Sequence, residues 1–92
     1  MSDPISKTVR ICNRLGLHAR ASAKFCKLAT AYDADITVTK DGYQVRGDSV
    51  LDLLMLTAHQ GVDIEIVATG PQAADAVDAL VRLVEHRFGE AD

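Results

Sequence analysis

The chain has 92 residues, which suits one small domain spanning 1–92 and leaves no room for a second core. Its net charge of −3 and its 4% aromatic content argue against a nucleic-acid-binding domain, which needs a basic surface and rings on which bases stack. No apolar run approaches the roughly 20 residues that span a bilayer, and the first ten residues lack the apolar region of a signal peptide, so we expect a cytoplasmic monomer without membrane insertion.

The N-terminal part of the chain predicts a strand followed by a helix. Residues 6–13 alternate in polarity, with Val9 and Ile11 on one side, as in a strand with one buried face. Residues 13–17 form a loop between the two elements. Residues 19–31 then carry small and apolar side chains at the i, i+3, i+4 and i+7 spacing of an amphipathic helix.

The middle of the chain predicts a hairpin and a short helix. Residues 34–40 alternate in polarity, and the Asp-Gly pair at 41–42 predicts a tight turn into a third strand. Either Asp48 or Ser49 can cap the short helix that follows, and we expect Gly61 to end it.

The C-terminal part predicts a strand at 62–68 and a long amphipathic helix at 72–88, separated by a Thr-Gly-Pro break. The element order is therefore β-α-β-β-α-β-α. A sheet with one polar face exposes that face to solvent, and helices have to pack only on its apolar face. We expect an α/β (α+β) fold of the open-faced β-sandwich type, with a four-stranded, mostly antiparallel sheet covered on one face by three helices. The pattern does not fix the strand order.

The first helix begins in an unusual way, within the stretch "NRLGLHARASAKF". His18 occupies the position where a capping Ser, Thr, Asp or Asn is expected. The positive end of the helix dipole disfavours a charged imidazole and keeps a ring nitrogen free as a nucleophile. A phosphoryl group on that nitrogen would meet the first helical amides, so we predict a phosphate-binding set of Ala19, Arg20 and Ala21, with charge-assisted hydrogen bonds from Arg20.

Other candidate sites are weaker. His59 and His86 are more simply structural or solvated residues, and no Cys or acid lies close in sequence to His18 to complete a metal site or a nucleophile–base pair. Cys12 and Cys26 form no CxxC motif and are most simply reduced thiols. We expect neither a metal nor an organic cofactor.

Two motifs, "GLHARASAKF" and "DSVLDLLML", together with the element order, make residues 6–88 resemble the histidine-containing phosphocarrier (HPr) family of the bacterial phosphoenolpyruvate-dependent phosphotransferase system. The resemblance implies a phosphoryl carrier rather than an enzyme. It implies that His18 accepts a phosphoryl group on Nδ1 from enzyme I and passes it to an enzyme IIA domain. It also implies that Arg20 helps to hold the phosphate.

One residue departs from the family pattern. The family's common sugar-uptake form has proline directly after that arginine, whereas this chain has Ala21. We hypothesise that the N–H of Ala21, which proline would lack, joins the phosphate-binding amides. The departure leaves open a regulatory, nitrogen-related branch of the family instead of a role in sugar import.

Ser49 has two interpretations. It is either only an N-cap or, as the resemblance implies, a regulatory site for an ATP-dependent HPr kinase/phosphorylase. A phosphate there would add roughly −1.5 to −2 charges at a helix N-terminus and would repel acidic partners. A regulatory binding module switched by Ser49 alone is a further alternative, but such a module has no need for both His18 and Arg20.

The short helix is more apolar than one buried side requires. We expect Leu53 and Leu56, with Val50, to face the core, and Leu51, Leu54 or Met55 to be partly exposed unless most of them are simply core. Residues 7–27 contain six basic residues and no acidic one. The predicted partner-docking surface therefore combines basic residues of the first helix with apolar residues of the short helix: Lys24, Lys27, Val50, Leu51 and Leu54.

Overall fold

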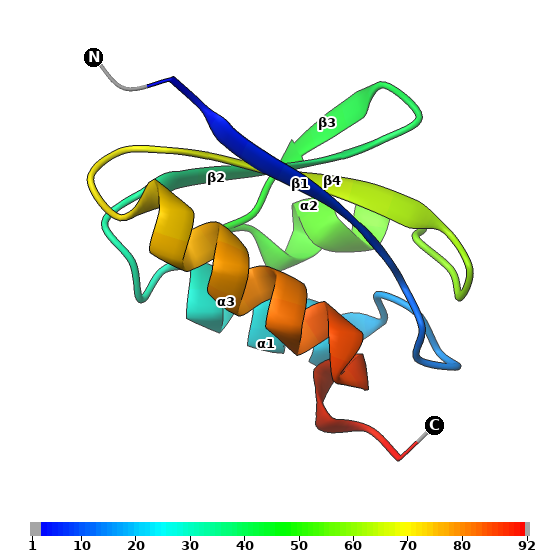
Figure 1. The fold of residues 1–92 in the computed structure, drawn as a ribbon. Helices are drawn as coiled ribbons and strands as arrows, with labels where there is room; N and C mark the ends of the chain where they lie inside the picture. The colour runs from blue at the N-terminus through cyan, green and yellow to red at the C-terminus, as the bar shows by residue number, and fades with distance from the viewer. Residues whose placement is uncertain (1–2, 92) are drawn as a thin grey trace.

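The structure is a computed structural model that describes residues 3–91 (Figure 1). The elements follow in the order β1 (Ile5–Arg10), α1 (Ala19–Ala29), β2 (Asp35–Lys40), β3 (Tyr43–Arg46), α2 (Val50–Met55), β4 (Asp63–Thr69), α3 (Ala73–Glu85) and a single 3₁₀ turn, η1 (Arg87–Gly89). None of the helices in this part of the chain is long and apolar enough to cross a membrane.

The four strands form one sheet in the order β1-β4-β2-β3, and every neighbouring pair is antiparallel. The helices lie on one face of this sheet, with α1 and α3 side by side along it (Figure 1). The predicted open-faced sandwich of four strands and three helices is confirmed. The structure adds the strand order, in which β4, the last strand in the chain, lies between β1 and β2.

The register of the strands separates a core face from a polar face. Val9 lies opposite Ile64, and Val38 lies opposite Ile66; all four side chains are buried. Glu65, between the two isoleucines on β4, points to the other face and is exposed. Because side chains alternate along a strand, a one-residue slip would exchange the two faces, so burial fixes the register.

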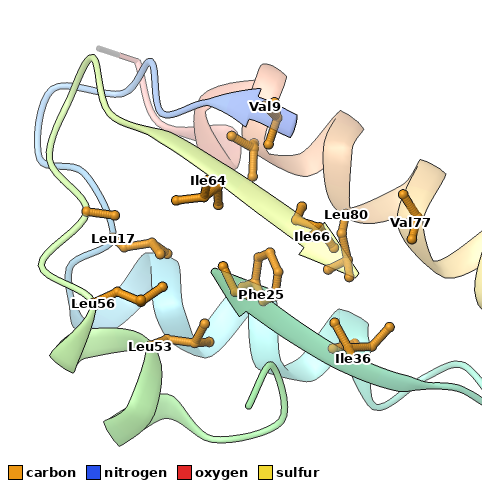
Figure 2. Packing of buried hydrophobic residues seen from close by; sticks show 14 of the residues in the cluster. Val9, Leu17, Phe25, Ile36, Leu53, Leu56, Ile64, Ile66, Val77 and Leu80 are labelled. Atoms are coloured by element: carbon orange, nitrogen blue, oxygen red, sulfur yellow. The ribbon is translucent and has the colours of Figure 1, made fainter. Parts of the chain in front are cut away.

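The core lies between the sheet and the helices. Figure 2 shows Phe25 of α1, Leu53 of α2 and Leu80 of α3 packed near Ile64 and Ile66 of β4. Each of the five is at most 1% exposed. Burial of one such side chain contributes about 1.5–3 kcal/mol, so this cluster holds all three helices to the sheet.

The hairpin follows the prediction, and the ends of β1 and α1 differ from it by a few residues. Asp41 and Gly42 have φ values of 50° and 80°, the two left-handed residues that a tight hairpin turn requires. β1 ends at Arg10. The next residue, Ile11, still donates its backbone N–H to the Val62 carbonyl and accepts the Gly61 N–H, so backbone hydrogen bonding to the segment before β4 extends one residue beyond the strand. α1 ends at Ala29 and not at residue 31.

α2 ends at Met55, so the prediction that Gly61 ends this helix was wrong. Lys40 of β2 donates from Nζ to the carbonyls of Leu56, at 3.2 Å, and Thr57, at 3.3 Å, which satisfies carbonyl groups at the helix end. Thr57 has a φ of 49°, a left-handed conformation that β-branched residues rarely adopt. This turn directs the segment after α2 toward the loop that precedes α1.

α3 ends at Glu85, so its predicted extension to Phe88 was also wrong. Arg87 and Phe88 both have left-handed φ values, 59° and 55°, which turn the chain. The Phe88 side chain is nevertheless 1% exposed and belongs to the core. Lys24 Nζ of α1 donates to the Phe88 carbonyl at 2.7 Å, so the C-terminal segment returns across α1.

Candidate functional site

His18 is the N-cap of α1, as its place in the sequence predicted. Its backbone is extended, with φ −76° and ψ −179°, and its Nδ1 accepts a hydrogen bond from the backbone N–H of Arg20 at 3.3 Å. The imidazole thus takes the role that a hydroxyl or carboxylate usually plays at a helix start. The nitrogen that faces the helix N-terminus is therefore an acceptor with an available electron pair.

The loop before His18 is held by the segment that follows α2. Leu17 donates its backbone N–H to the Ala58 carbonyl at 2.9 Å, and its side chain is buried. Gly16 has a φ of 67°, and a Cβ at this position would lie 2.5 Å from the Ala58 carbonyl oxygen. Only glycine combines this conformation with this close approach, so the fold fixes where His18 begins the helix.

A carboxylate lies on the other side of the imidazole. His18 Nε2 is 2.5 Å from Glu90 Oε2, and the side chains are 27% and 19% exposed. Asn13, fully buried in the loop, donates from Nδ2 to Glu90 Oε1 at 2.9 Å and to the Gly16 carbonyl at 2.8 Å. Glu90 is 72 residues from His18, and no local sequence pattern points to Glu90 or to Asn13, so neither residue was predicted from the sequence.

Glu90 is ionised in this environment. Partial burial by itself raises the pKa of the Glu90 carboxyl, but the hydrogen bonds from Asn13 and His18, with the positive charge of Lys24, outweigh it and leave the pKa below the ordinary value. The carboxylate accepts a hydrogen bond from His18 Nε2 while Nδ1 accepts one from Arg20. This arrangement places the ring proton on Nε2 and leaves Nδ1 unprotonated.

The predicted phosphate-binding residues lie in different environments. Ala19 and Arg20 are exposed in the first turn of α1, and a pocket of about 140 Å³ opens beside them. Its lining contains two arginines and the imidazole–carboxylate pair: Arg14, Leu15, His18, Arg20, Glu90 and Ala91. Ala21 has no exposed surface, so its amide is closed to an incoming phosphate in this conformation. Burial of Ala21 disfavours the hypothesis that its N–H joins the phosphate-binding amides, and the hypothesis stays a prediction until it is tested by substitution.

Some of the predicted docking residues are exposed, some are half-buried, and one is hydrogen-bonded within the protein. Leu51 is 69% exposed, Val50 and Leu54 are half-buried, and Lys27 is exposed. The Lys24 ammonium, in contrast, is bound to the Phe88 carbonyl. As predicted, Leu53 and Leu56 are buried. Four further large apolar side chains are exposed outside the docking set: Ile5, Leu15, Tyr43 and Met55. Leu15 lines the same pocket as His18, and Met55 lies on α2.

Ser49 is the N-cap of α2, which settles the choice between Asp48 and Ser49. Its Oγ accepts the backbone N–H of Asp52 at 3.2 Å. Asp48 instead accepts two hydrogen bonds from the Arg46 guanidinium, which lower the pKa of the Asp48 carboxyl. Ser49 is half-buried at the start of the helix that carries Leu51.

The remaining candidates are two further histidines and the two cysteines. His59 is exposed in the loop after α2, and His86 is exposed at the C-cap of α3. Cys12 and Cys26 are free, half-buried thiols, and Cys12 Sγ donates to the Val84 carbonyl. Within residues 3–91, no three His, Cys, Asp or Glu side chains are grouped so that they could hold a metal ion.

A histidine that caps a helix with an unprotonated Nδ1, beside an exposed arginine, is arranged to receive an anionic group. The sequence matches a family model described as "PTS HPr component phosphorylation site" over residues 5–86. The chain therefore belongs to the HPr family of phosphocarrier proteins.

Individual relatives agree with this assignment. Phosphocarrier protein HPr of Neisseria meningitidis serogroup A is 40% identical over 88 residues, which cover 96% of this chain and 99% of that protein. Phosphocarrier protein NPr of Shewanella violacea is 42% identical over 87 residues, which cover 95% and 96%. The crystal structure of HPr-C-His from Thermoanaerobacter tengcongensis has a TM-score of 0.92 at 35% identity and covers 96% of this chain and 99% of its own.

Proposed function

We propose that this protein is a cytoplasmic phosphoryl carrier of the phosphoenolpyruvate-dependent phosphotransferase system. In this proposal His18 accepts a phosphoryl group on Nδ1 from enzyme I and passes it to an enzyme IIA domain. The observation that carries it is the position of Nδ1 at the N-terminus of α1, where it accepts the Arg20 N–H at 3.3 Å and carries no proton.

The transfer needs no cofactor. The Nδ1 electron pair forms the N–P bond while the bond between phosphorus and the donor breaks, and the electron pair of that broken bond stays with the donor. The amides of Ala19 and Arg20 and the Arg20 guanidinium donate hydrogen bonds to the phosphoryl oxygens. In the onward step the N–P bond breaks, and its electron pair returns to Nδ1.

Partner proteins would dock on the surface formed by α2, the loop before α1 and α1 itself. Leu51 and Met55 of α2 and Leu15 of the loop expose apolar surface, and α2 packs against α1, which carries Arg20 and Lys27. An apolar patch with cations at its edge suits weak, reversible contact with an acidic partner surface. Val50 and Leu54 contribute the half-buried part of the patch, and Lys24 adds positive charge from α1 while its ammonium donates to the Phe88 carbonyl.

A phosphorylation assay tests the proposal. The protein is incubated with phosphoenolpyruvate and enzyme I, and the phosphate is tested for stability in acid and in base. We expect an acid-labile, base-stable phosphate that His18→Ala abolishes and Ser49→Ala leaves in place. Acid-stable phosphate, or label that persists in His18→Ala, would exclude His18 as the acceptor.

A second candidate function is regulatory. One observation favours a branch outside sugar import: Ala21 stands where the sugar-uptake form has proline. Relatives of both kinds are similar to this chain, an NPr at 42% identity and an HPr at 40%. Purified phospho-protein is offered to an enzyme IIA domain of a sugar transporter and to one of the nitrogen-related branch. Faster transfer to the nitrogen-related domain supports this branch, and faster transfer to the sugar domain rejects it.

Ser49 adds a separate regulatory proposal. Its Oγ lies at the N-terminus of α2, beside the apolar docking patch, so a phosphate there would place negative charge where an acidic partner docks. We expect an HPr kinase/phosphorylase with ATP to produce acid-stable phosphate that Ser49→Ala eliminates. If no phosphoserine forms at position 49, Ser49 acts only as the cap of α2.

A further inference from the structure

The geometry points to Glu90 as a positioning residue for His18. We propose that its carboxylate keeps the ring proton on Nε2, directs the Nδ1 electron pair toward the N-terminus of α1, and balances the charge that the ring gains on phosphorylation. The last part rests on the proposed function of His18. The first two parts concern the ring itself and hold whether or not a phosphoryl group is transferred.

The imidazole is held from both sides by groups of opposite hydrogen-bonding character. On one side the Arg20 N–H donates to Nδ1 at 3.3 Å, and on the other Glu90 Oε2 lies 2.5 Å from Nε2. A carboxylate can only accept, so it requires a proton on Nε2, while a backbone N–H can only donate, so it requires an unprotonated Nδ1. One tautomer satisfies both neighbours, and the opposite tautomer satisfies neither.

Glu90 is itself fixed by residues that are distant in the sequence. The buried Asn13 amide donates to Oε1, the carboxylate oxygen that His18 does not use, at 2.9 Å. The backbone before Glu90 is anchored by the buried Phe88 side chain and by the hydrogen bond from Lys24 Nζ to the Phe88 carbonyl. We call residues 86–90 the C-terminal strap. The strap places a carboxylate at a defined position rather than on a free chain end.

The position of Glu90 matters for the chemistry because no proton leaves the ring during transfer. When Nδ1 forms the N–P bond, Nε2 keeps its hydrogen, and the ring becomes an N-phosphorylated imidazolium with one positive charge. The Glu90 carboxylate at Nε2 stabilises that charge, as a carboxylate stabilises the imidazolium of a catalytic histidine. When the N–P bond breaks in onward transfer, the ring returns to the neutral tautomer with the proton still on Nε2.

The test combines a measurement of the ring with a measurement of transfer. Long-range ¹H–¹⁵N correlation spectra of the unphosphorylated, ¹⁵N-labelled protein report the tautomer of neutral His18 directly. We expect the wild-type protein to hold a single tautomer with the proton on Nε2 and Glu90→Ala to show a mixture. Glu85→Gln removes one exposed acidic charge from the end of α3 and serves as the matched control, which should keep the wild-type tautomer.

The second measurement is the equilibrium of phosphoryl exchange with phosphorylated enzyme I. We expect Glu90→Ala and Glu90→Gln to shift this equilibrium about tenfold toward the unphosphorylated protein, the scale of one lost hydrogen bond to a charged group. Glu85→Gln should leave it unchanged. Glu90→Gln nearly preserves the volume of the side chain, so it tests the charge even if Glu90→Ala disturbs the strap.

The outcomes separate this inference from the proposed function. If His18 of the wild-type protein accepts no phosphate, the proposed function fails, and the tautomer spectra still decide whether Glu90 positions the ring. If His18 is phosphorylated but Glu90→Ala and Glu90→Gln match Glu85→Gln in tautomer and equilibrium, Glu90 has no positioning role and the inference is overturned.

Discussion

Gly16 lies two residues before His18, where the chain turns with a φ of 67° and passes close to the Ala58 carbonyl. Gly42 also has a positive φ, 80°, but a Cβ there would meet no atom within 4 Å. The two glycines therefore separate the cost of a left-handed backbone from the cost of a steric clash.

We predict that Gly16→Ala lowers the free energy of unfolding by about 2–4 kcal/mol, because it adds a backbone clash to the left-handed strain, and that it slows phosphate acceptance at the displaced His18. Gly42→Ala should cost only about 1–2 kcal/mol and leave acceptance unchanged. Urea denaturation and the enzyme I assay measure both. Equal losses of stability in the two variants would show that the contact with Ala58 is unimportant.

The ionisation of Glu90 is linked to folding. Its pKa is lower in the folded protein than the ordinary value of 4.5, so the ionised form stabilises the fold. This contribution is complete above the ordinary pKa and is lost as the pH falls through the lower folded pKa. We predict that wild-type protein and Glu90→Gln differ most in unfolding free energy near neutral pH and differ less at an acidic pH below the ordinary pKa of the Glu90 carboxyl. A difference that is the same at both pH values would contradict this.

At the scale of the elements, the start of α1 was predictable and the ends of α2 and α3 were not. The helical spacing that starts at residue 19, with no Ser, Thr, Asp or Asn directly before it, identifies His18 as the N-cap residue from local sequence alone. The end of α2 depends on Lys40, which lies on β2 and binds the carbonyls of Leu56 and Thr57. The end of α3 depends on Phe88, which reaches the core only because the chain turns before it.

The first turn of α1 gives a prediction that reverses the sequence-based hypothesis about Ala21. Its amide is in the helix's first turn, where no intrahelical bond is lost to proline, and it is not exposed to an incoming phosphate. We predict that Ala21→Pro accepts phosphate at the wild-type rate, within about twofold, and is equally or slightly more stable, by up to about 1 kcal/mol. Stopped-flow or quench-flow transfer from phosphorylated enzyme I measures the rate. A tenfold slower rate would instead support the hypothesis that the Ala21 N–H binds the phosphate.

At the scale of the whole molecule, the sequence predicted the layers of the fold and the chemistry of one side of the site. Alternation along Val9 to Ile11 and along the β4 segment required a one-sided sheet, and the strand order then came from three-dimensional pairing alone. His18 and Arg20 were found because they are neighbours in the chain. Glu90 and Asn13 were not, because they meet only when the C-terminal strap closes over the loop before α1.

The proposed docking patch also belongs to this scale, because it combines α2 with the loop before α1. Leu51 is 69% exposed, so Leu51→Asp should leave the free energy of unfolding within about 0.5 kcal/mol of wild type. It should weaken binding to enzyme I about tenfold, since it puts a negative charge in the patch that meets an acidic partner. Ile5→Asp, an exposed apolar position at the far end of β1, is the control and should bind normally. Titration by calorimetry measures both affinities, and equal affinities would remove α2 from the docking surface.

We propose that Nδ1 of His18 carries the phosphoryl group, and NMR of the phosphorylated protein tests this proposal most directly. Protein labelled with ¹⁵N in histidine is phosphorylated by phosphoenolpyruvate and enzyme I, and the coupling between phosphorus and the ring nitrogens is recorded. We expect one phosphoryl group, coupled to Nδ1 of His18, with Nε2 still protonated. Coupling to Nε2, or to a nitrogen of His59 or His86, would contradict it.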